Sequence, residues 1–142
     1  MNTFLGSLPL LFLLLGGGNG DSVTQTEGQV TLPEGLRRPS DPPRRASLTV
    51  NCSYESTQYP ALLWYVQYPG ESPQLLLRAT KANEKGSNRG FEALYNKDSS
   101  SFHLVKSSVQ ESDSAMYYCA LSVGGWAKMH FGAGTQVVVT PD

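Results

Sequence analysis

The sequence of 142 residues is poor in charged residues, histidine and cysteine. Charged residues make up 16% of it, against roughly 25% in an average soluble domain, and the formal net charge is −1. A nearly neutral chain has no overall field to attract nucleic acid or an anionic membrane, so we expect no nucleic-acid partner. The 2 cysteines and 2 histidines have no tight ligand spacing, so we expect no metal and no cofactor.

Signatures of catalysis are also missing. The sequence has no nucleophile-elbow glycines, no phosphate-binding loop and no histidine with a paired carboxylate at usable spacing. His103 falls at an outward position of an alternating segment, where we expect it to face solvent. An enzyme needs a convergent set of polar groups. We therefore do not expect this chain to be an enzyme.

Long apolar runs are missing as well. The apolar stretch of residues 8–15 is too short to cross a bilayer as a helix, and Gly18 and Gly20 fit a small-x-small cleavage site ahead of Asp21. This pattern predicts a signal peptide over residues 1–20 and one domain over residues 21–142. No second apolar segment of about 20 residues follows, so we expect no direct membrane insertion by this chain.

The two cysteines are predicted to form a disulfide, because a chain that enters the secretory pathway folds in an oxidising compartment. Cys52 and Cys119 are 67 positions apart. In the loop-entropy model, closing a loop of that length stabilises the fold by roughly 4 kcal/mol.

Seven short segments carry strand patterns separated by turn signals. In residues 47–54, for example, Leu48, Val50 and Cys52 alternate with polar neighbours. No run of ten or more residues has a strong helical period, so the pattern predicts an all-β sandwich. The seven segments cover residues 47–54, 61–68, 74–79, 90–96, 101–106, 115–121 and 135–140.

Cys52, Trp64 and the motif DSAMYYC that ends at Cys119 together resemble an immunoglobulin variable domain. The resemblance implies a variable-type two-sheet Greek-key sandwich, with Trp64 packed on the disulfide and Tyr117 forming a tyrosine corner. It also implies an ion pair between two residues that hold the fold and bind no ligand. These two residues are Asp113 and Arg89.

The segment FGAGTQVVVT, which begins at Phe131, resembles the joining segment of antigen receptors, here about residues 122–142. Its glycines are expected where the last strand bends and needs positive φ or close backbone approach. The framework LLWYVQYPGESPQLLL and the ending VVVTPD resemble T-cell receptor alpha chains more than antibody light chains. An antibody light-chain variable domain and an immunoglobulin-like adhesion module remain the alternatives.

Three irregular segments match the antigen-binding loops of that family: residues 56–61, 79–85 and 120–130. The third lacks any folding period, as expected of a loop selected for binding on a scaffold that already folds. Trp126 offers a large rigid anchor, and either the antigen or the partner domain is a reasonable contact for it. Lysines in the second loop are equally consistent with solvated turn residues. The expected antigen-binding residues are Gln58, Tyr59, Lys81, Glu84, Val123, Gly124, Gly125, Trp126 and Lys128.

Strand alternation also predicts an exposed aromatic face, because Trp64 and Tyr117 point inward and their neighbours outward. In the family, such a face contacts the variable domain of a T-cell receptor beta chain, and the two domains bind a peptide held by a major histocompatibility molecule. The resemblance implies the extracellular face of the plasma membrane, with anchoring and signalling subunits acting through parts absent from this chain. The expected interface residues are Tyr65, Gln67, Pro73, Leu75, Tyr118 and Phe131.

Two features stay open at the level of sequence. Residues 35–45, GLRRPSDPPRR, occupy a place where the family has a short turn, and either a genuine insertion or a sequence artefact explains them. Asn51 begins the sequon Asn-Cys-Ser, and its outward direction leaves room for a glycan, although a strand is a poor acceptor.

Overall fold

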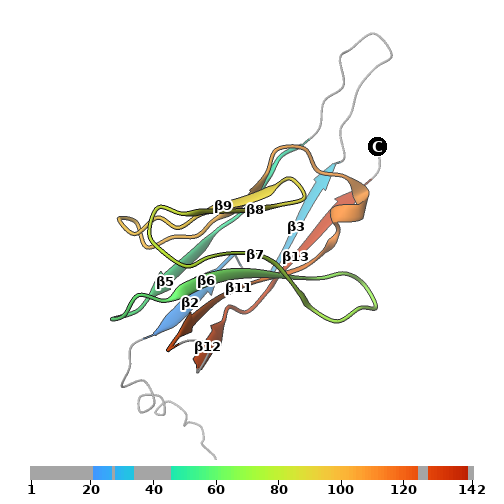
Figure 1. Ribbon diagram of the computed structural model, residues 1–142. Helices are drawn as coiled ribbons and strands as arrows, with labels where there is room; N and C mark the ends of the chain where they lie inside the picture. The colour runs from blue at the N-terminus through green and yellow to red at the C-terminus, as the bar shows by residue number, and fades with distance from the viewer. Residues whose placement is uncertain (1–20, 27, 34–45, 125–127, 141–142) are drawn as a thin grey trace, which may run out of the picture.

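The computed structural model describes residues 21–26, 28–33, 46–124 and 128–140, which form two β-sheets packed face to face (Figure 1). The predicted signal peptide of residues 1–20 and the arginine- and proline-rich residues 35–45 lie outside the described residues.

The first sheet is antiparallel and has the strand order β4-β10-β9-β8. Strand β5 continues from β4 beyond Asn51 and pairs with β2, so that β2 extends the same layer. The strands are β2 (Ser22–Gln25), β4 (Leu48–Val50), β5 (Cys52–Glu55), β8 (Lys85–Asn88), β9 (Phe91–Leu94) and β10 (Leu104–Lys106).

The second sheet has the order β3-β13-β11-β6-β7, with β12 also paired to β11. Its pairs are antiparallel except for β3 and β13, which run parallel. The chain passes from one sheet to the other after β2, β3, β5, β7 and β10, which gives the predicted Greek-key sandwich. The strands are β3 (Gly28–Pro33), β6 (Ala61–Gln67), β7 (Gln74–Ala79), β11 (Ala115–Val123), β12 (Lys128–Phe131) and β13 (Thr135–Thr140).

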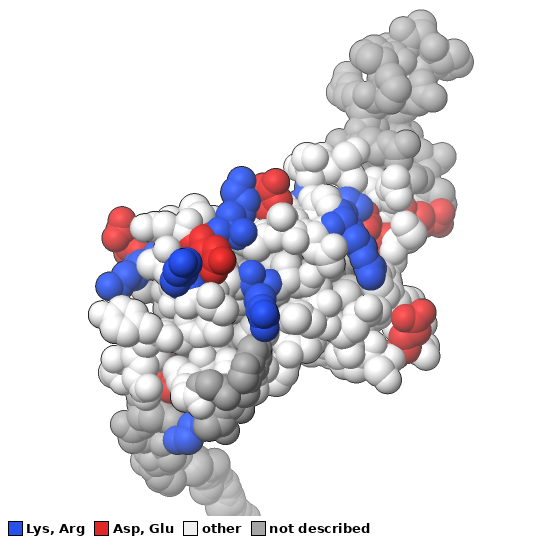
Figure 2. Space-filling model, viewed as in Figure 1, with Lys and Arg blue, Asp and Glu red and all other residues white. Residues whose placement is uncertain are grey.

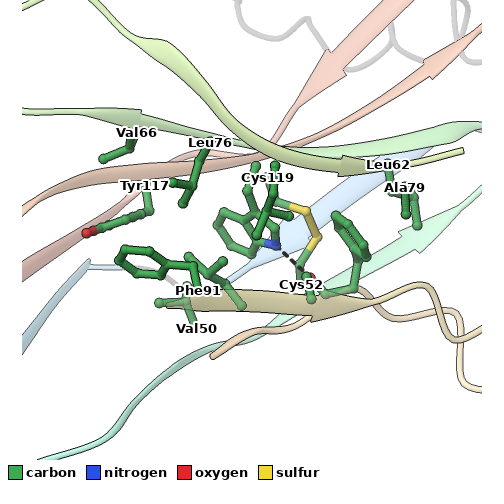
Figure 3. Packing of buried hydrophobic residues seen from close by; sticks show 14 of the residues in the cluster. Val50, Cys52, Leu62, Val66, Leu76, Ala79, Phe91, Tyr117 and Cys119 are labelled. Carbon is green, nitrogen blue, oxygen red and sulfur yellow. Dashed lines mark hydrogen bonds between the residues drawn. A yellow bond between two sulfur atoms is a disulfide. The ribbon is translucent and has the colours of Figure 1, made fainter. Parts of the chain in front are cut away.

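The core lies between the sheets, where the inward residues of both alternate with outward polar ones (Figure 3). At its centre, the predicted disulfide joins Cys52 of β5 to Cys119 of β11, with a Cα–Cα distance of 6.4 Å. Trp64 is fully buried, lies opposite Cys119 on the neighbouring strand β6, and donates its indole N–H to the carbonyl oxygen of Phe102, 2.8 Å away. The indole therefore fills the space between the sheets without leaving its polar N–H unpaired.

Four strands were not expected from the sequence, and one expectation about an outward residue was incomplete. Strands β2, β3, β8 and β12 lie outside the seven predicted segments. His103 is half-buried, and its Nδ1 accepts a hydrogen bond of 2.9 Å from the backbone N–H of Cys52. Its ring therefore lies on the outer face of the sheet, where it accepts a hydrogen bond from the backbone and is not simply exposed to solvent.

Tyr117 forms the predicted tyrosine corner. Its hydroxyl donates a 2.6 Å hydrogen bond to the carbonyl oxygen of Asp113, in the short 3-10 turn η2 (Glu111–Asp113) that precedes β11. Burial of the ring raises the pKa of Tyr117, so the hydroxyl stays protonated and remains a donor. The bond fixes the turn against the strand that carries Cys119.

The predicted ion pair of Asp113 with Arg89 is wrong in its basic partner. Lys106 at the end of β10 places its Nζ 2.9 and 2.8 Å from the two carboxylate oxygens of Asp113, in a largely buried position. Arg89 instead lies in the exposed β8–β9 turn with φ of 54°, and its guanidinium donates to the hydroxyl of Tyr68 at 3.4 Å. The left-handed backbone of that turn directs the arginine away from Asp113.

Replacing Lys106 with methionine should destabilise the domain by about 3 kcal/mol, because the buried carboxylate of Asp113 loses its partner while the apolar stem is kept. Arg89→Met is the matched control and should change the free energy of unfolding by less than about 0.5 kcal/mol. Chemical denaturation of both variants measures the difference. A larger loss for Arg89→Met would restore the original assignment.

Candidate binding surfaces

Three loops of the sandwich meet at one end of the second sheet. The register pairs Ala61, at the start of β6, with Ser122 near the end of β11, and Leu62 with Ala79 at the end of β7. The strand ends from which the three segments leave therefore lie side by side, and the first two loops lie at the left end of the molecule in Figure 1. The first two loops are residues 56–60 and 80–84, with shorter bounds than predicted; of the third segment, between Val123 and Lys128, the structure describes Gly124.

The first loop presents an aromatic side chain. Tyr59 is 81% exposed, and Gln58 beside it is exposed as well, as predicted. The hydroxyl of Ser56 accepts a hydrogen bond from the backbone N–H of Gln58 at 3.1 Å, which bends the loop at its start. An exposed tyrosine on a bent, short loop is suited to contact another molecule.

The second loop is held by its own acidic residue. One carboxylate oxygen of Glu84 accepts hydrogen bonds from the backbone N–H of Thr80 at 2.7 Å and from its hydroxyl at 3.3 Å. The hydrogen bond from the Thr80 backbone is the main reason that the pKa of Glu84 is lowered. Of the two residues predicted here, Lys81 is exposed and available for contact, whereas Glu84 closes the loop.

The third loop is shorter than predicted, because β11 and β12 pair as a hairpin as far as Val123 and Lys128. Val123 is only 5% exposed and belongs to the hydrophobic core, so its assignment as an antigen contact is corrected. Gly124 is exposed with φ of 65°, and Lys128 is exposed at the far side of the hairpin. Gly125 and Trp126 lie outside the described residues.

The segment between β12 and β13 uses its two glycines as predicted. Gly134 has φ of 99°, and a Cβ there would lie 2.7 Å from the ring of Tyr118. Gly132 lies against the side chain of Gln25, which the sequence analysis missed. The amide of Gln25 is buried, accepts from the backbone N–H of Cys119 at 3.0 Å and donates to the carbonyl oxygen of Tyr117 at 2.9 Å. It therefore ties β2 of the first layer to β11.

The predicted aromatic face forms on the outer side of β6, β7 and β11. Tyr65 has Tyr118 and Leu75 as its neighbours across the two strand pairs, and its ring centroid lies 5.5 Å from that of Phe131. Tyr65, Pro73, Tyr118 and Phe131 line one open hollow of about 370 Å³. Phe131 is 52% exposed and Leu75 43% exposed, and both neighbour Tyr65, so they form part of one exposed apolar patch.

Gln67 lies on the same face but is already engaged. Its side-chain amide donates a 3.0 Å hydrogen bond to the carbonyl oxygen of Glu71 in the β6–β7 turn. Charges of both signs are interspersed over the side of the molecule that Figure 2 shows, with no large area of one sign. Among the residues that the structure describes, no helix is long and apolar enough to cross a membrane.

Comparisons with known proteins agree on one family. Residues 38–140 match the immunoglobulin V-set domain. The chain is 63% identical over 122 residues to T cell receptor alpha variable 9-1 of Homo sapiens, covering 86% of this chain and 100% of that protein. It is 60% identical over 122 residues to T cell receptor alpha variable 9-2 of Homo sapiens, with the same coverage.

A mouse relative matches a larger share of the chain. T-cell receptor alpha chain V region CTL-F3 of Mus musculus is 51% identical over 135 residues, which cover 95% of this chain and 94% of that protein. All three relatives are alpha chains, which favours this assignment over an antibody light chain or an adhesion module. The chain therefore belongs to the variable regions of T-cell receptor alpha chains, within the immunoglobulin V-set family.

Proposed function

We propose that this domain pairs through its aromatic face with the variable domain of a T-cell receptor beta chain and binds peptide presented by a major histocompatibility molecule. The observation that carries the proposal is the arrangement of the two surfaces. The aromatic face covers one side of the second sheet, and the three loops leave the end of that same sheet. A partner on the side therefore leaves the loop end open for a ligand.

Pairing is supported by the apolar content of the face. Burying the exposed side chains of Phe131 and Leu75 against a partner would stabilise the complex by roughly 25 cal/mol per Å² of apolar area removed from water. The neighbouring hollow is a pocket between Tyr65 and Tyr118 that can accept an apolar side chain of the partner. Aromatic residues around such a pocket are typical of the buried centre of protein interfaces.

Antigen contact is assigned to the exposed residues of the loops. Tyr59 and Lys81 are exposed on the first two loops, and Lys128 flanks the third. We assign Trp126 to the tip of the third loop as an aromatic anchor for the peptide complex. Anchoring in the plasma membrane and signalling belong to other parts of the receptor, so this domain acts by binding alone.

Leu75→Ser should weaken assembly with a beta chain by about 1–2 kcal/mol, or roughly fivefold to thirtyfold, because it removes apolar contact area from the proposed interface. Leu94→Ser is a matched control, since Leu94 is 45% exposed on a strand of the first sheet, against 43% for Leu75. Titration of the purified chain with a beta variable domain measures both. Equal effects would place the partner elsewhere.

Trp126→Ala should leave assembly and surface level of the receptor unchanged, but reduce binding of the cognate peptide complex more than tenfold, because losing an interface anchor costs on the order of 2 kcal/mol. Staining with an antibody against the beta chain reports assembly, and peptide-loaded histocompatibility multimers report recognition. Lower surface receptor with unchanged multimer binding per receptor would instead place Trp126 in the interface between the chains.

A further inference from the structure

The outer face of the first sheet carries a second hollow, remote from the aromatic face. It has a volume of about 200 Å³ and lies over β8, β9 and β10. Leu94 and Val105, both exposed, supply apolar surface, and Lys85 and Glu92 form an ion pair of 3.5 Å at its edge. His103 closes the side nearest β5, with its Nδ1 bound to the N–H of Cys52. In the neutral ring, this bond puts the proton on Nε2, where it is a donor.

Asn51 lies next to this hollow. Val50 pairs with Leu104, and Ser53 pairs with Ser101, so Asn51 lies opposite His103 on the neighbouring strand. Strands are about 4.8 Å apart, less than the length of one sugar ring. The residues on both sides of Asn51 are fully buried, whereas Asn51 is exposed and its backbone N–H and carbonyl bind Thr26. Its side-chain amide therefore stands on the outer face.

We propose that Asn51 carries an N-linked glycan whose first sugars lie over this hollow. The sequon Asn51-Cys52-Ser53 supplies the acceptor. N-acetylglucosamine has apolar ring faces and a rim of hydroxyl and acetamide groups. The apolar faces match Leu94 and Val105, and the polar rim matches the Nε2–H of His103 and the carboxylate of Glu92.

The group transfer takes place before the strand forms. The amide nitrogen of Asn51 displaces the pyrophosphate of an oligosaccharide–lipid donor: the bond from sugar C1 to nitrogen forms, the bond from C1 to the phosphate oxygen breaks, and the amide loses one proton. Cys52 lies inside the sequon, but its disulfide partner follows 67 residues later. Synthesis at about 5–20 residues per second gives an interval of roughly 3–13 seconds, during which Asn51 is in an extended, unpaired chain.

The test uses the chain secreted from mammalian cells with a beta chain. Intact mass should show a glycan that peptide-N-glycosidase removes, and both Asn51→Gln and Ser53→Ala should lack it. In the native protein, the double variant Leu94→Ser, Val105→Ser should release the Asn51 glycan at least threefold faster than wild type, while Glu71→Ser, at an exposed position in the β6–β7 turn of the other sheet, should not. Masses that differ between wild type and the two sequon variants only by the substituted side chain, or an equal release rate for the double variant, would overturn the proposal.

A separate observation concerns Tyr95, which lies beneath the first loop. Its ring is buried edge-on against Tyr54, with the centroids 5.9 Å apart, and its hydroxyl donates a 2.8 Å hydrogen bond to the carbonyl oxygen of Pro60. Burial is the main cause that raises the pKa of Tyr95 to about 12. The hydroxyl is therefore a permanent donor to the last residue of the loop.

A turn that follows Tyr95 holds the loop from the outside. Asn96 and Ser101 exchange two backbone hydrogen bonds of 3.0 Å, which make this turn rigid. From the turn, Lys97 places its Nζ 4.9 Å from the centre of the Tyr59 ring. Tyr59 is thereby restrained although it is mostly exposed.

We infer that Tyr95 and Lys97 are positioning residues that hold the first loop ready for the ligand. This inference rests on the proposed function. A loop fixed before binding loses less freedom on association, so removing either contact should slow association. Neither residue needs to touch the ligand for this effect.

Tyr95→Phe is compared with Tyr117→Phe, since each removes one buried hydroxyl that donates to a backbone carbonyl, at opposite ends of the domain. Both should lower Tm. Of these two variants, only Tyr95→Phe should speed amide exchange in residues 56–59 of the free receptor and slow association with the peptide complex at least threefold. A third variant, Lys97→Met, should have the same two effects without lowering Tm. Unchanged exchange in Tyr95→Phe and Lys97→Met would refute the positioning role, whereas wild type that binds no peptide complex would refute the proposed function.

Discussion

The disulfide between Cys52 and Cys119, with Trp64 packed beside it, is the constraint on which the rest of the molecule depends. It joins one strand of each sheet at the centre of the core, and the indole hydrogen bond to Phe102 connects the sheets again at the same depth. Because these contacts hold the two sheets together at their centre, the loops at one end of the second sheet and the outward residues of β6 and β11 are not needed to join the sheets. Those positions are therefore free to serve binding.

The two candidate surfaces follow from that freedom. β6 and β11 carry inward residues that build the core and outward residues that build the aromatic face, so one pair of strands serves both purposes. The same strands end together and so bring the loops to one place. In the third segment, strand β11 ends at the buried Val123, so residues up to Val123 belong to the scaffold. Because Val123 pairs with Lys128, residues 124–127 are the part of the irregular sequence that stands between the two paired strands.

Sequence alone predicted the features that depend on local pattern. Alternating polarity located the strands of the core, the two cysteines of a chain expected to be secreted predicted the disulfide, and the resemblance to variable domains implied the tyrosine corner. It missed features that depend on distances across the fold. Lys106 rather than Arg89 meets Asp113 because of where β10 ends and how the β8–β9 turn is bent. The polar segment of β8 has no alternation to reveal it, and nothing near Gln25 in the sequence indicates that its amide binds β11.

The central claim is that scaffold and recognition are separable in this domain. The most direct measurement replaces residues 124–128 with a five-residue glycine–serine segment and records Tm, beta-chain assembly and peptide-complex binding on the same preparation. The account predicts a change in Tm of less than about 4 °C, equivalent to under about 1 kcal/mol, normal assembly, and loss of binding to the cognate complex. A domain that unfolds or fails to assemble, or one that still binds its complex with unchanged affinity, would contradict it.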